Sequence, residues 1–589
     1  MSDGADVRIV DQALADSANA LVEKLVGDAA ASKLSAGDPT LWGPDAEPEA
    51  SKRLSWVSLH DTSRPLVDEL AALRRELHDD GVDRVVLAGM GGSSLAPEVI
   101  CATRSGGPVG GEFPLVVLDT TDPMQVSDAL AGDLTRTVLV VSSKSGGTVE
   151  TDSQRRVFAE VFEANGIDAA SRMVVVTDPG TKLGDLARDQ GYRKLIEADP
   201  GVGGRYSALT AFGLVPSALT GVDVGALLDE AAAVAPELAR DSADNPAVVL
   251  AAAMAAAHNA GAEKLVLADT GSGLVGFGNW AEQLIAESTG KQGTGLLPVV
   301  VEGRPHGDPG IAPGFSDHGS DATPVALGPA GSGAQVSVTG TLGGQFLLWE
   351  HAVALAGRLI GINPFDQPDV ESAKQATRDL LASAEDGGGR DGGASGDDAP
   401  IVTDGVIEIR AAGDASWLGQ PATVIDAIQA LVTAAPDRGY IAIQAYLDRL
   451  DDASFATLRP ELAKATGLQT TFGWGPRFLH STGQYHKGGH QNGVFLQITG
   501  SVADDLAIPG QPFSFGTLEH AQARGDAGVL AAAKNGRPEG EIPGRPVLRL
   551  HLADRAAGLV ALANAVRETQ RSGEHADRGA RPSDGEVSR

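Results

Sequence analysis

A glutamine and a glutamate stand four residues apart in a segment whose pattern is typical of a helix. In residues 279–291 (NWAEQLIAESTGK), this spacing puts Gln283 and Glu287 on one helix face, before Ser-Thr-Gly ends the helix. A carboxylate near a helix C-terminus is disfavoured as an anion, so the pKa of Glu287 should rise. Such a carboxyl group suits a general base that works near neutral pH. A solvated glutamate on an exposed face has the same spacing, and this alternative stays open.

A second segment has the composition of a phosphate-binding loop. Residues 143–151 (SKSGGTVET) follow an apolar run and precede an expected helix, whose N-terminus carries partial positive charge. The hydroxyls of Ser143, Ser145 and Thr148, with Lys144, predict a phosphate cradle that needs no metal. The spacing differs from that of a nucleotide P-loop. A surface helix capped by a hydroxyl is the alternative.

Two glycine-rich segments offer further ligand contacts. In residues 89–97 (GMGGSSLAP), Gly92 and Ser93 lie where a strand should run into a helix, so a ligand could approach the backbone there. In residues 201–207 (GVGGRYS), the guanidinium of Arg205 could stabilise a developing oxyanion. A tight turn and a surface salt bridge would explain the same residues.

Three of the 12 histidines lie in residues 479–490 (LHSTGQYHKGGH). The Gly-Gly between His486 and His490 argues against a helical metal-binding pair, so we predict no metal and favour His480 as a single catalytic or hydrogen-bonding group. Residues 271–276 (GSGLVG) resemble a dinucleotide-binding pattern, but the acid near the required spacing, Glu287, lies inside the expected helix. We therefore expect no nicotinamide or other cofactor.

Short apolar runs alternate with helical segments from Asp83 onward, which predicts parallel sheets covered on both faces. The runs fall at residues 85–89, 115–119, 137–142, 173–178, 265–270, 335–340, 406–411, 440–446, 494–500 and 547–552. We expect an α/β protein with two doubly wound units. The predicted limits are a helical segment at 1–80, a first α/β domain at 81–245, a second at 246–570 with a flexible insert at 385–400, and a disordered tail at 571–589.

The composition excludes several classes of function. The 589-residue chain has 46 basic and 78 acidic residues, a formal charge of −32, so its surface should repel nucleic acid and anionic membranes. One cysteine, Cys101, excludes an intramolecular disulfide framework. The acidic N-terminus is not typical of a secretory signal, and no apolar stretch reaches about 18 residues. We expect a soluble, cytoplasmic protein.

Taken together, these segments resemble the glucose-6-phosphate isomerase family, which consists of two sugar-isomerase (SIS) domains. The resemblance covers roughly residues 80–500 and includes GMGGSSLAP, SKSGGTVET, GGRYS, QLIAESTGK, NPFDQPDVESAK (363–374) and LHSTGQYHKGG. It is strongest to the isomerase portion of bifunctional transaldolase/glucose-6-phosphate isomerases. The resemblance implies two doubly wound parallel-sheet SIS domains with additional helices, and a role in glycolysis and gluconeogenesis.

The resemblance also implies a role for each matched residue. A sugar phosphate would be surrounded by Gly92, Ser93, Ser143, Lys144, Ser145, Thr148 and Gln283. Glu287 would move a proton between C2 and C1, Arg205 would stabilise the cis-enediolate, and His480 would assist ring opening together with Lys374. In the family this histidine comes from the neighbouring subunit, which implies a homodimer.

The order of the segments departs from the family pattern. The histidine segment ordinarily lies between the glutamate and lysine segments, whereas this chain has Glu287, then Lys374, then His480. The second domain should therefore be rearranged, and His306 and His318 compete with His480 for the ring-opening role. Gly146 and Gly147 stand where many family members carry bulkier residues, which could loosen substrate choice.

Two other functions fit part of the pattern. A non-catalytic sugar-phosphate sensor would keep residues 143–148 but would not need Glu287, Arg205 and His480 together. An SIS enzyme for another sugar phosphate, such as an amino sugar, also fits. A glutamine-dependent aminotransferase is disfavoured because no cysteine follows the initiator methionine.

Overall fold

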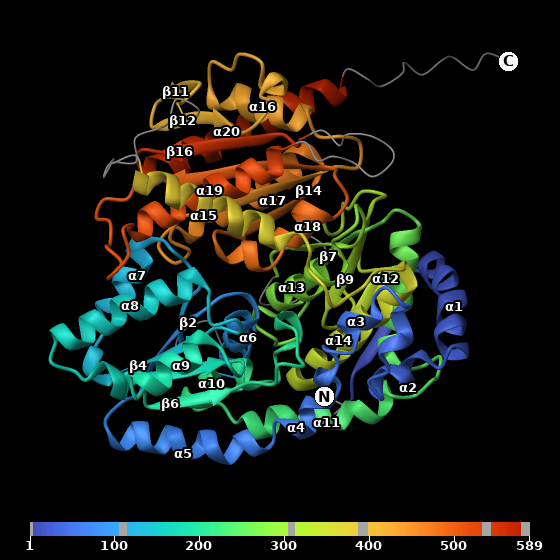
Figure 1. Ribbon diagram of the computed structural model, residues 1–589. Helices are drawn as coiled ribbons and strands as arrows, with labels where there is room; N and C mark the ends of the chain where they lie inside the picture. Colours follow the sequence, from blue (N-terminus) through green and yellow to red (C-terminus); the bar gives the residue numbers. More distant parts are fainter. Residues whose placement is uncertain (1–3, 105–114, 304–311, 387–398, 533–543, 579–589) are drawn as a thin grey trace.

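The computed structural model describes every residue except 1–3, 105–114, 304–311, 387–398, 533–543 and 579–589. The described residues form three β-sheets, which we call sheets A, B and C in the order of their central strands along the chain. In Figure 1, sheet A lies at the lower left, sheet B at the lower right and sheet C above both.

Sheet A is wholly parallel and has the strand order β3-β2-β4-β5-β6. Its strands are β2 (Arg84–Gly89), β3 (Leu115–Leu118), β4 (Thr137–Ser142), β5 (Met173–Thr177) and β6 (Lys194–Glu197). Successive connections leave β2 toward β3 and β4 toward β5, in opposite directions. The carboxyl ends of β2 and β4 therefore border the crevice where doubly wound sheets bind ligands.

The parallel strands of sheets B and C follow the same relative order as the first four strands of sheet A. Sheet B adds the antiparallel strand β1 at one edge, and sheet C adds β11 and β12. Sheet B has the order β1-β10-β9-β7-β8, and sheet C has the order β11-β12-β16-β15-β13-β14. The strands of sheet B are β1 (Asp6–Ile9), β7 (Lys264–Asp269), β8 (Leu297–Val300), β9 (Ala322–Leu327) and β10 (Val336–Thr339). Those of sheet C are β11 (Val402–Asp404), β12 (Ile407–Ala411), β13 (Tyr440–Tyr446), β14 (Gln469–Trp474), β15 (Gly493–Gly500) and β16 (Val547–Leu552).

Twenty α-helices connect and cover these strands within the described residues. The first ten are α1 (Gln12–Gly27), α2 (Ala30–Ser35), α3 (Glu47–Ala50), α4 (Leu59–Thr62), α5 (Pro65–Asp79), α6 (Leu95–Arg104), α7 (Pro123–Leu130), α8 (Val149–Ala164), α9 (Lys182–Asp189) and α10 (Ala211–Leu219). The others are α11 (Val224–Leu238), α12 (Pro246–Asn259), α13 (Phe277–Thr289), α14 (Leu342–Ile360), α15 (Val370–Asp386), α16 (Val424–Thr433), α17 (Leu458–Thr466), α18 (Gly483–Gly488), α19 (Phe515–Ala531) and α20 (Arg555–Arg578).

The predicted α/β class with parallel sheets is confirmed, but the number of sheets differs from our expectation. All ten predicted apolar runs form strands. We expected those after Leu265 to form one sheet, whereas they form two, because β13 begins a new parallel core with β14 and β15 as its neighbours. The helical segment 1–80 also contains a strand, β1, which pairs with β10 at an edge of sheet B.

The predicted insert and tail fall largely on residues that the structure does not describe. Of the insert at 385–400, residues 387–398 lie outside the described residues, and α15 ends at Asp386. Helix α20 continues to Arg578, beyond the expected start of the disordered tail at residue 571, since no proline interrupts it before Pro582. Residues 579–589 lie outside the described residues. The predicted domain limits stay a prediction.

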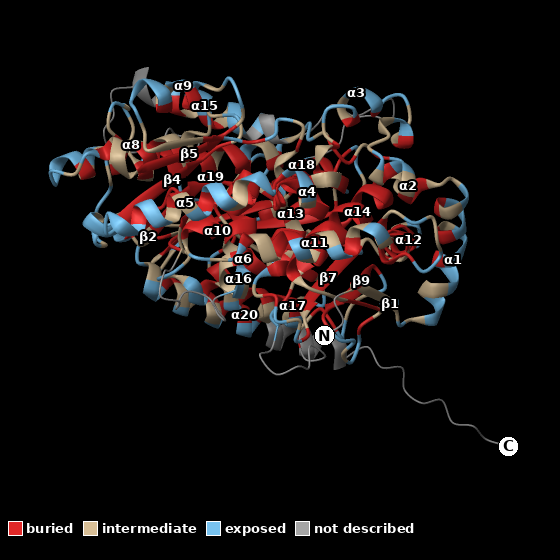
Figure 2. Ribbon diagram, turned by 90° about the horizontal axis from the view of Figure 1, so that it is seen from below, coloured by how far each residue is buried: buried red, intermediate tan, exposed pale blue. Residues whose placement is uncertain are grey.

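Alternate residues of the central β-strands pack into two different cores. In β2, Val85 and Leu87 face one side with α5, α6 and α10, while Val86 and Ala88 face the other side with α8 and α19. Sheets B and C share a third core, in which Val266 and Val299 pack with Phe495. Figure 2 shows buried residues running through the interior across all three parts. Among the described helices, none is long and apolar enough to cross a bilayer.

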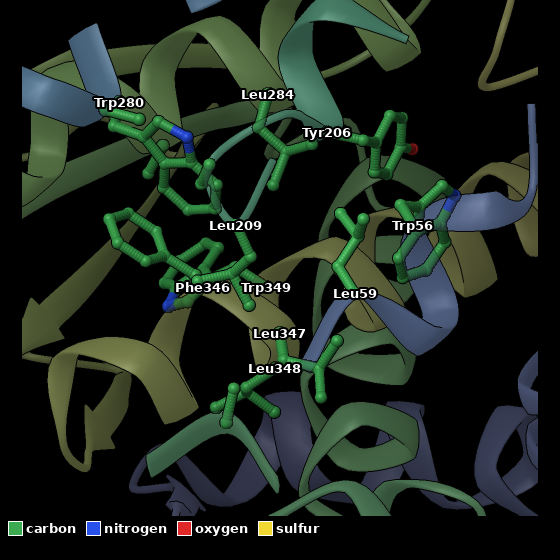
Figure 3. Close-up of a cluster of buried hydrophobic side chains, with 14 of the residues drawn as sticks. Trp56, Leu59, Tyr206, Leu209, Trp280, Leu284, Phe346, Leu347, Leu348 and Trp349 are labelled. Carbon is green, nitrogen blue, oxygen red and sulfur yellow. The ribbon is translucent and has the colours of Figure 1, made fainter. Parts of the chain in front are cut away.

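A cluster of large buried side chains includes Tyr206 and Leu284, which come from the segments that carry Arg205 and Glu287 (Figure 3). Trp56 stacks on Tyr206 at a ring-centroid distance of 4.9 Å, and Trp280 meets Phe346 edge-on at 4.6 Å. Tyr206 follows Arg205 in the chain, and Leu284 lies in α13 one turn before Glu287. The packing of this cluster therefore fixes the backbone that presents both charged groups.

Truncating this cluster should destabilise the protein strongly. Trp349 on α14 is completely buried in the cluster, so Trp349→Ala should lower the free energy of unfolding by about 3–5 kcal/mol. Chemical denaturation monitored by circular dichroism would measure the change. Val560→Ala is the control, because Val560 is 62% exposed and its loss should cost less than about 0.5 kcal/mol. Equal stability of the two variants would contradict the packing described.

Candidate active site

A cavity of about 620 Å³ opens at the carboxyl ends of β2 and β4. It lies at the crevice expected from the strand order of sheet A. All eleven residues predicted from the sequence line this one cavity: Gly92, Ser93, Ser143, Lys144, Ser145, Thr148, Arg205, Gln283, Glu287, Lys374 and His480. They are drawn from six stretches of chain that span nearly 400 residues, from Gly92 to His480.

The predicted phosphate loop lies between β4 and α8. Thr148 is the N-cap residue of α8, and its Oγ1 lies 2.9 Å from the Oγ of buried Ser143. Ser145 is exposed, and its Oγ accepts a hydrogen bond from the Gly147 amide at 3.3 Å. A sixteen-residue helix therefore begins at the cavity and directs its free amide groups toward it, as an anion-binding helix does.

The cation of this loop already has a partner. The Lys144 ammonium group forms an ion pair with Asp178, and both residues line the cavity. Burial raises the pKa of the Asp178 carboxyl, and the hydrogen bond from Lys144 opposes this shift. Arg53, from the N-terminal segment, also lines the cavity and is paired with Glu49 at 2.7 Å.

The predicted base, Glu287, lies at the inner wall of the cavity. Its side chain is 7% exposed, and its Oε2 lies 3.2 Å from the Arg205 Nε. The Gln283 amide donates to the other oxygen, Oε1, at 3.3 Å, as the four-residue spacing predicts. The pKa of the Glu287 carboxyl is raised chiefly by burial, while the charge of Arg205 and the hydrogen bond from Gln283 oppose the shift. The expected direction is therefore found, with burial as its main cause.

Arg205 is held rigidly beside this base. Its guanidinium donates to the backbone carbonyl of Glu287 at 2.6 Å and to that of Phe365 at 3.2 Å. It also donates to the carbonyl of Pro364 and to the Gln367 Oε1. With a side chain only 3% exposed, Arg205 is a fixed positive charge next to the place where a bound substrate meets Glu287.

His480 reaches the cavity from the loop that follows β14 of sheet C. Its backbone carbonyl accepts from the Gln283 amide at 2.9 Å, and its Nε2 lies 3.2 Å from the Oε1 of buried Glu150. The geometry thus favours His480 over His318, which does not line the cavity and contacts the neighbouring Gly319 carbonyl. His306 lies outside the described residues. Lys374, at an exposed position on α15, also lines the cavity, and its charge acts on Glu150, the partner of His480.

Comparison with known proteins decides the family. The phosphoglucose isomerase family model matches residues 67–296. A probable glucose-6-phosphate isomerase of Haloarcula marismortui is 32% identical over 371 residues, which cover 81% of that protein and 55% of this chain. The chain belongs to the phosphoglucose isomerase family. The family predicted from the motifs is confirmed.

Further relatives and structures agree with this family. A probable glucose-6-phosphate isomerase of Methanococcus maripaludis is 28% identical over 355 residues, covering 80% of that protein and 51% of this chain. The crystal structure of a glucose-6-phosphate isomerase from Chlamydia trachomatis aligns with a TM-score of 0.52 and 19% identity, over 65% of this chain and 90% of its own. This structural likeness supports the shared α/β fold.

The phosphoglucose isomerase model covers only the first part of the site. Its match includes Arg205 and Glu287 but ends at residue 296, before Lys374 and His480. In the structure, α15 and the loop after β14 bring these two later residues to the matched part. The narrower likeness to bifunctional transaldolase enzymes stays a prediction.

Sequence reasoning missed several residues of the site. Glu150 and Gln367 lie within the quoted motifs, but their side chains were given no role. Glu49 and Arg53 come from the N-terminal segment, in which no motif marks them. Gln522 on α19 donates to the Glu150 Oε1 at 2.7 Å, and no feature of its own segment points to the site. Gln522 comes near the site only because α19 and α8 pack into the same core.

Two glycines of the site should respond very differently to an added methyl group. A Cβ at Gly92 would lie 2.0 Å from the Gly204 carbonyl oxygen, so Gly92→Ala must displace the loop that carries Arg205. A Cβ at Gly147 would meet nothing within 4 Å. Because a displacement of about 1 Å can cost about 10²-fold in rate, Gly92→Ala should lower kcat/KM at least that far.

Gly147→Ala is the matched control and should stay within a few-fold of the wild-type kcat/KM. Steady-state kinetics on both purified variants, with circular dichroism to check folding, would measure the difference. A folded Gly92→Ala protein with wild-type kcat/KM would show that the close approach of these two loops is not needed.

Proposed function

We propose that this chain is a glucose-6-phosphate isomerase, which interconverts glucose 6-phosphate and fructose 6-phosphate. The observation that carries the proposal is the buried Glu287–Arg205 pair, with the Ser143–Thr148 loop in the same cavity. An aldose–ketose isomerisation requires a base, a fixed positive charge for the oxyanion and a site for the phosphate. A sensor would need the loop but not the buried pair.

The proton transfer is assigned to Glu287. Its carboxylate removes the proton from C2 of the open-chain aldose and returns it to C1, while the proton of the C2 hydroxyl passes to the C1 oxygen, so that the aldehyde becomes the ketose through a cis-enediolate. The negative charge that develops on the substrate oxygens is stabilised by Arg205, whose position is fixed before the reaction begins. The substrate and the product are isomers, so the reaction involves no net oxidation or reduction. The base is regenerated in each turnover.

Ring opening is assigned to His480 with Lys374. The cyclic sugar opens when a proton is delivered to the ring oxygen and another leaves the C1 hydroxyl. The Glu150 carboxylate, 3.2 Å from the His480 Nε2, orients the imidazole for this exchange. Lys374 lines the same cavity and supplies a positive charge that acts on Glu150.

The phosphate is assigned to the loop between β4 and α8. The hydroxyls of Ser143, Ser145 and Thr148 and the amide groups at the start of α8 are the donors, with Lys144 at the edge. Gly92, Ser93 and Gln283 border the sugar. In this assignment the six-carbon chain reaches from the phosphate loop to Glu287 within the one cavity.

A homodimer and a cytoplasmic location are further proposals that rest on the resemblance and the composition. The reason given above for a dimer was a histidine from the neighbouring subunit. In this structure the chain's own His480 lies in the cavity, so that reason no longer applies, and only a measurement of the molecular mass in solution would support a dimer.

The first experiment is metal-free turnover of glucose 6-phosphate in the presence of EDTA, followed by a coupled readout in both directions. Turnover that survives chelation supports the proposal. Absence of turnover, with glucose 6-phosphate still raising the melting temperature, would instead indicate a binding protein or an enzyme for another sugar phosphate.

Removing the base should abolish catalysis without unfolding the protein. Glu287→Gln keeps the size of the side chain and should lower kcat by about 10²–10⁴-fold or more. Because burial raises the pKa of Glu287, and because the base acts only when ionised, the wild-type kcat should fall with decreasing pH at a higher pH than for an ordinary glutamate. Appreciable turnover by a folded Glu287→Gln protein would contradict the assignment of Glu287 as the base.

Removing the loop lysine should weaken substrate binding more than catalysis. Lys144 belongs to the phosphate loop and pairs with Asp178, whereas the base pairs with Arg205, so Lys144→Ala should raise KM more than it lowers kcat. Asp178→Asn, which removes the partner of Lys144, is a useful companion and should lower KM or leave it unchanged, since the cation is then freed for the substrate. An unchanged KM for Lys144→Ala would remove this lysine from the phosphate site.

A further inference from the structure

Gln522 forms a bridge between the site and two other elements. Its amide nitrogen donates to the Glu150 Oε1 at 2.7 Å, and its carbonyl oxygen accepts from the Thr121 hydroxyl at 2.8 Å. The same Glu150 oxygen lies 3.2 Å from the His480 Nε2. A carboxylate only accepts hydrogen bonds, so the Gln522 nitrogen must face Glu150 and the oxygen must face Thr121. The amide orientation is therefore determined by its two partners.

The helix that carries Gln522 is anchored at both ends. In α19, the residues before Gln522 (Phe515, Leu518 and Ala521) pack into the core on one face of sheet A. The residues after it (Ala527 and Leu530) pack into the core that sheets B and C share. Gln522 itself is 3% exposed. Its amide group thus has little freedom to turn away from Glu150.

Glu150 is a buried carboxylate whose charge depends on its neighbours. It lies in the first turn of α8, where the helix N-terminus favours a negative charge. Burial alone would raise the pKa of Glu150, but the hydrogen bond and charge of His480, with the charge of Lys374, hold this pKa below its usual value. The titratable groups that interact with Glu150 are His480 on the loop after β14, Lys374 on α15 and Tyr446 on β13.

From this geometry we propose that Gln522 is a positioning residue for ring opening, which fixes Glu150 as an oriented acceptor for His480. This inference rests on the proposed function, because it concerns the ring-opening step of that reaction. Gln522 does not line the cavity and acts through Glu150. Without the Gln522 amide, Glu150 would lose a donor that keeps it ionised and in place, and His480 would lose its fixed orientation.

The first test is Gln522→Leu, which removes both hydrogen bonds of the amide. We expect kcat to fall about tenfold, as for the loss of a hydrogen bond to a charged group, with KM within about twofold of the wild-type value. Anomerisation of glucose 6-phosphate, followed by NMR exchange, needs ring opening but no proton transfer at C2. It should fall by the same factor as kcat in Gln522→Leu, whereas Glu287→Gln should leave it largely intact.

Gln154→Leu is the matched control. Gln154 on α8 is also buried, and its side chain donates to the Thr120 carbonyl at 2.8 Å and forms no hydrogen bond with the Glu150 carboxylate among the described residues. The substitution should lower the free energy of unfolding by a similar amount. The anomerisation rate of this variant should stay close to that of the wild type. Equal kinetics of the two folded leucine variants would overturn the role of Gln522.

A second variant keeps the test decisive if Gln522→Leu fails to fold. Gln522→Glu preserves the shape, but the new carboxyl can donate to Glu150 only when it is protonated, since two adjacent carboxylates disfavour double ionisation. The ratio of its kcat to the wild-type kcat should therefore rise as the pH falls from 8.5 to 6.5, and dividing by the wild-type value cancels the titration of Glu287. A ratio that is independent of pH would overturn the proposal.

The outcomes separate this inference from the proposed function. The wild-type protein is measured first in the same assays, and its turnover tests the isomerase activity by itself. Wild-type turnover with an unaffected Gln522→Leu protein would refute only the positioning role. Absence of wild-type turnover would refute the proposed function, and with it the step that Gln522 is said to support.

Discussion

The site depends on keeping one carboxylate and one guanidinium side by side in a place that water hardly reaches. A buried charge is costly unless it is paired and hydrogen-bonded. Arg205 satisfies this requirement with the Glu287 carboxylate and with the carbonyls of the segment that leads into α15. The same burial that makes the pair costly raises the pKa of Glu287 and concentrates the field of Arg205. Binding, base strength and oxyanion stabilisation thus share one structural origin.

A second cluster of buried ion pairs joins the part of the chain around sheet A to sheet C. Arg477, three residues before His480, pairs with Asp119 at 2.6 Å and also with Glu98, while Arg449 pairs with Glu98 at 2.8 Å. Glu98 and Asp119 belong to the part of the chain around sheet A, and the two arginines belong to sheet C. Ion pairs of this kind specify one arrangement, because any shift between the sheets would leave buried charges unpaired. His480 therefore reaches the cavity only when sheet C is correctly docked.

Much of the site could be predicted because it follows local rules. Gly92, Ser143 and Thr148 lie in the segments that follow β2 and β4, and the spacing of Gln283 and Glu287 is that of a helix face, so the sequence itself predicts where these residues lie. The alternation of apolar runs likewise predicted ten strands. The division into sheets B and C could not be predicted, because strand pairing after β10 depends on which strand nucleates a new sheet. The contact between Glu150 and Gln522 could not be predicted for a similar reason, since it joins segments 372 residues apart.

A chain with a net charge of −32 must still attract an anionic substrate, and the cavity suggests how it does so. Three of its cations have acidic partners within the structure: Lys144 with Asp178, Arg53 with Glu49, and Arg205 with Glu287. In such pairs the cation is already oriented, and part of its desolvation has already occurred on folding. A phosphate that arrives can compete with a carboxylate for the outer lysine, while the helix amide groups of α8 supply neutral donors. The inner pair stays intact, because its carboxylate is the base on which the chemistry depends.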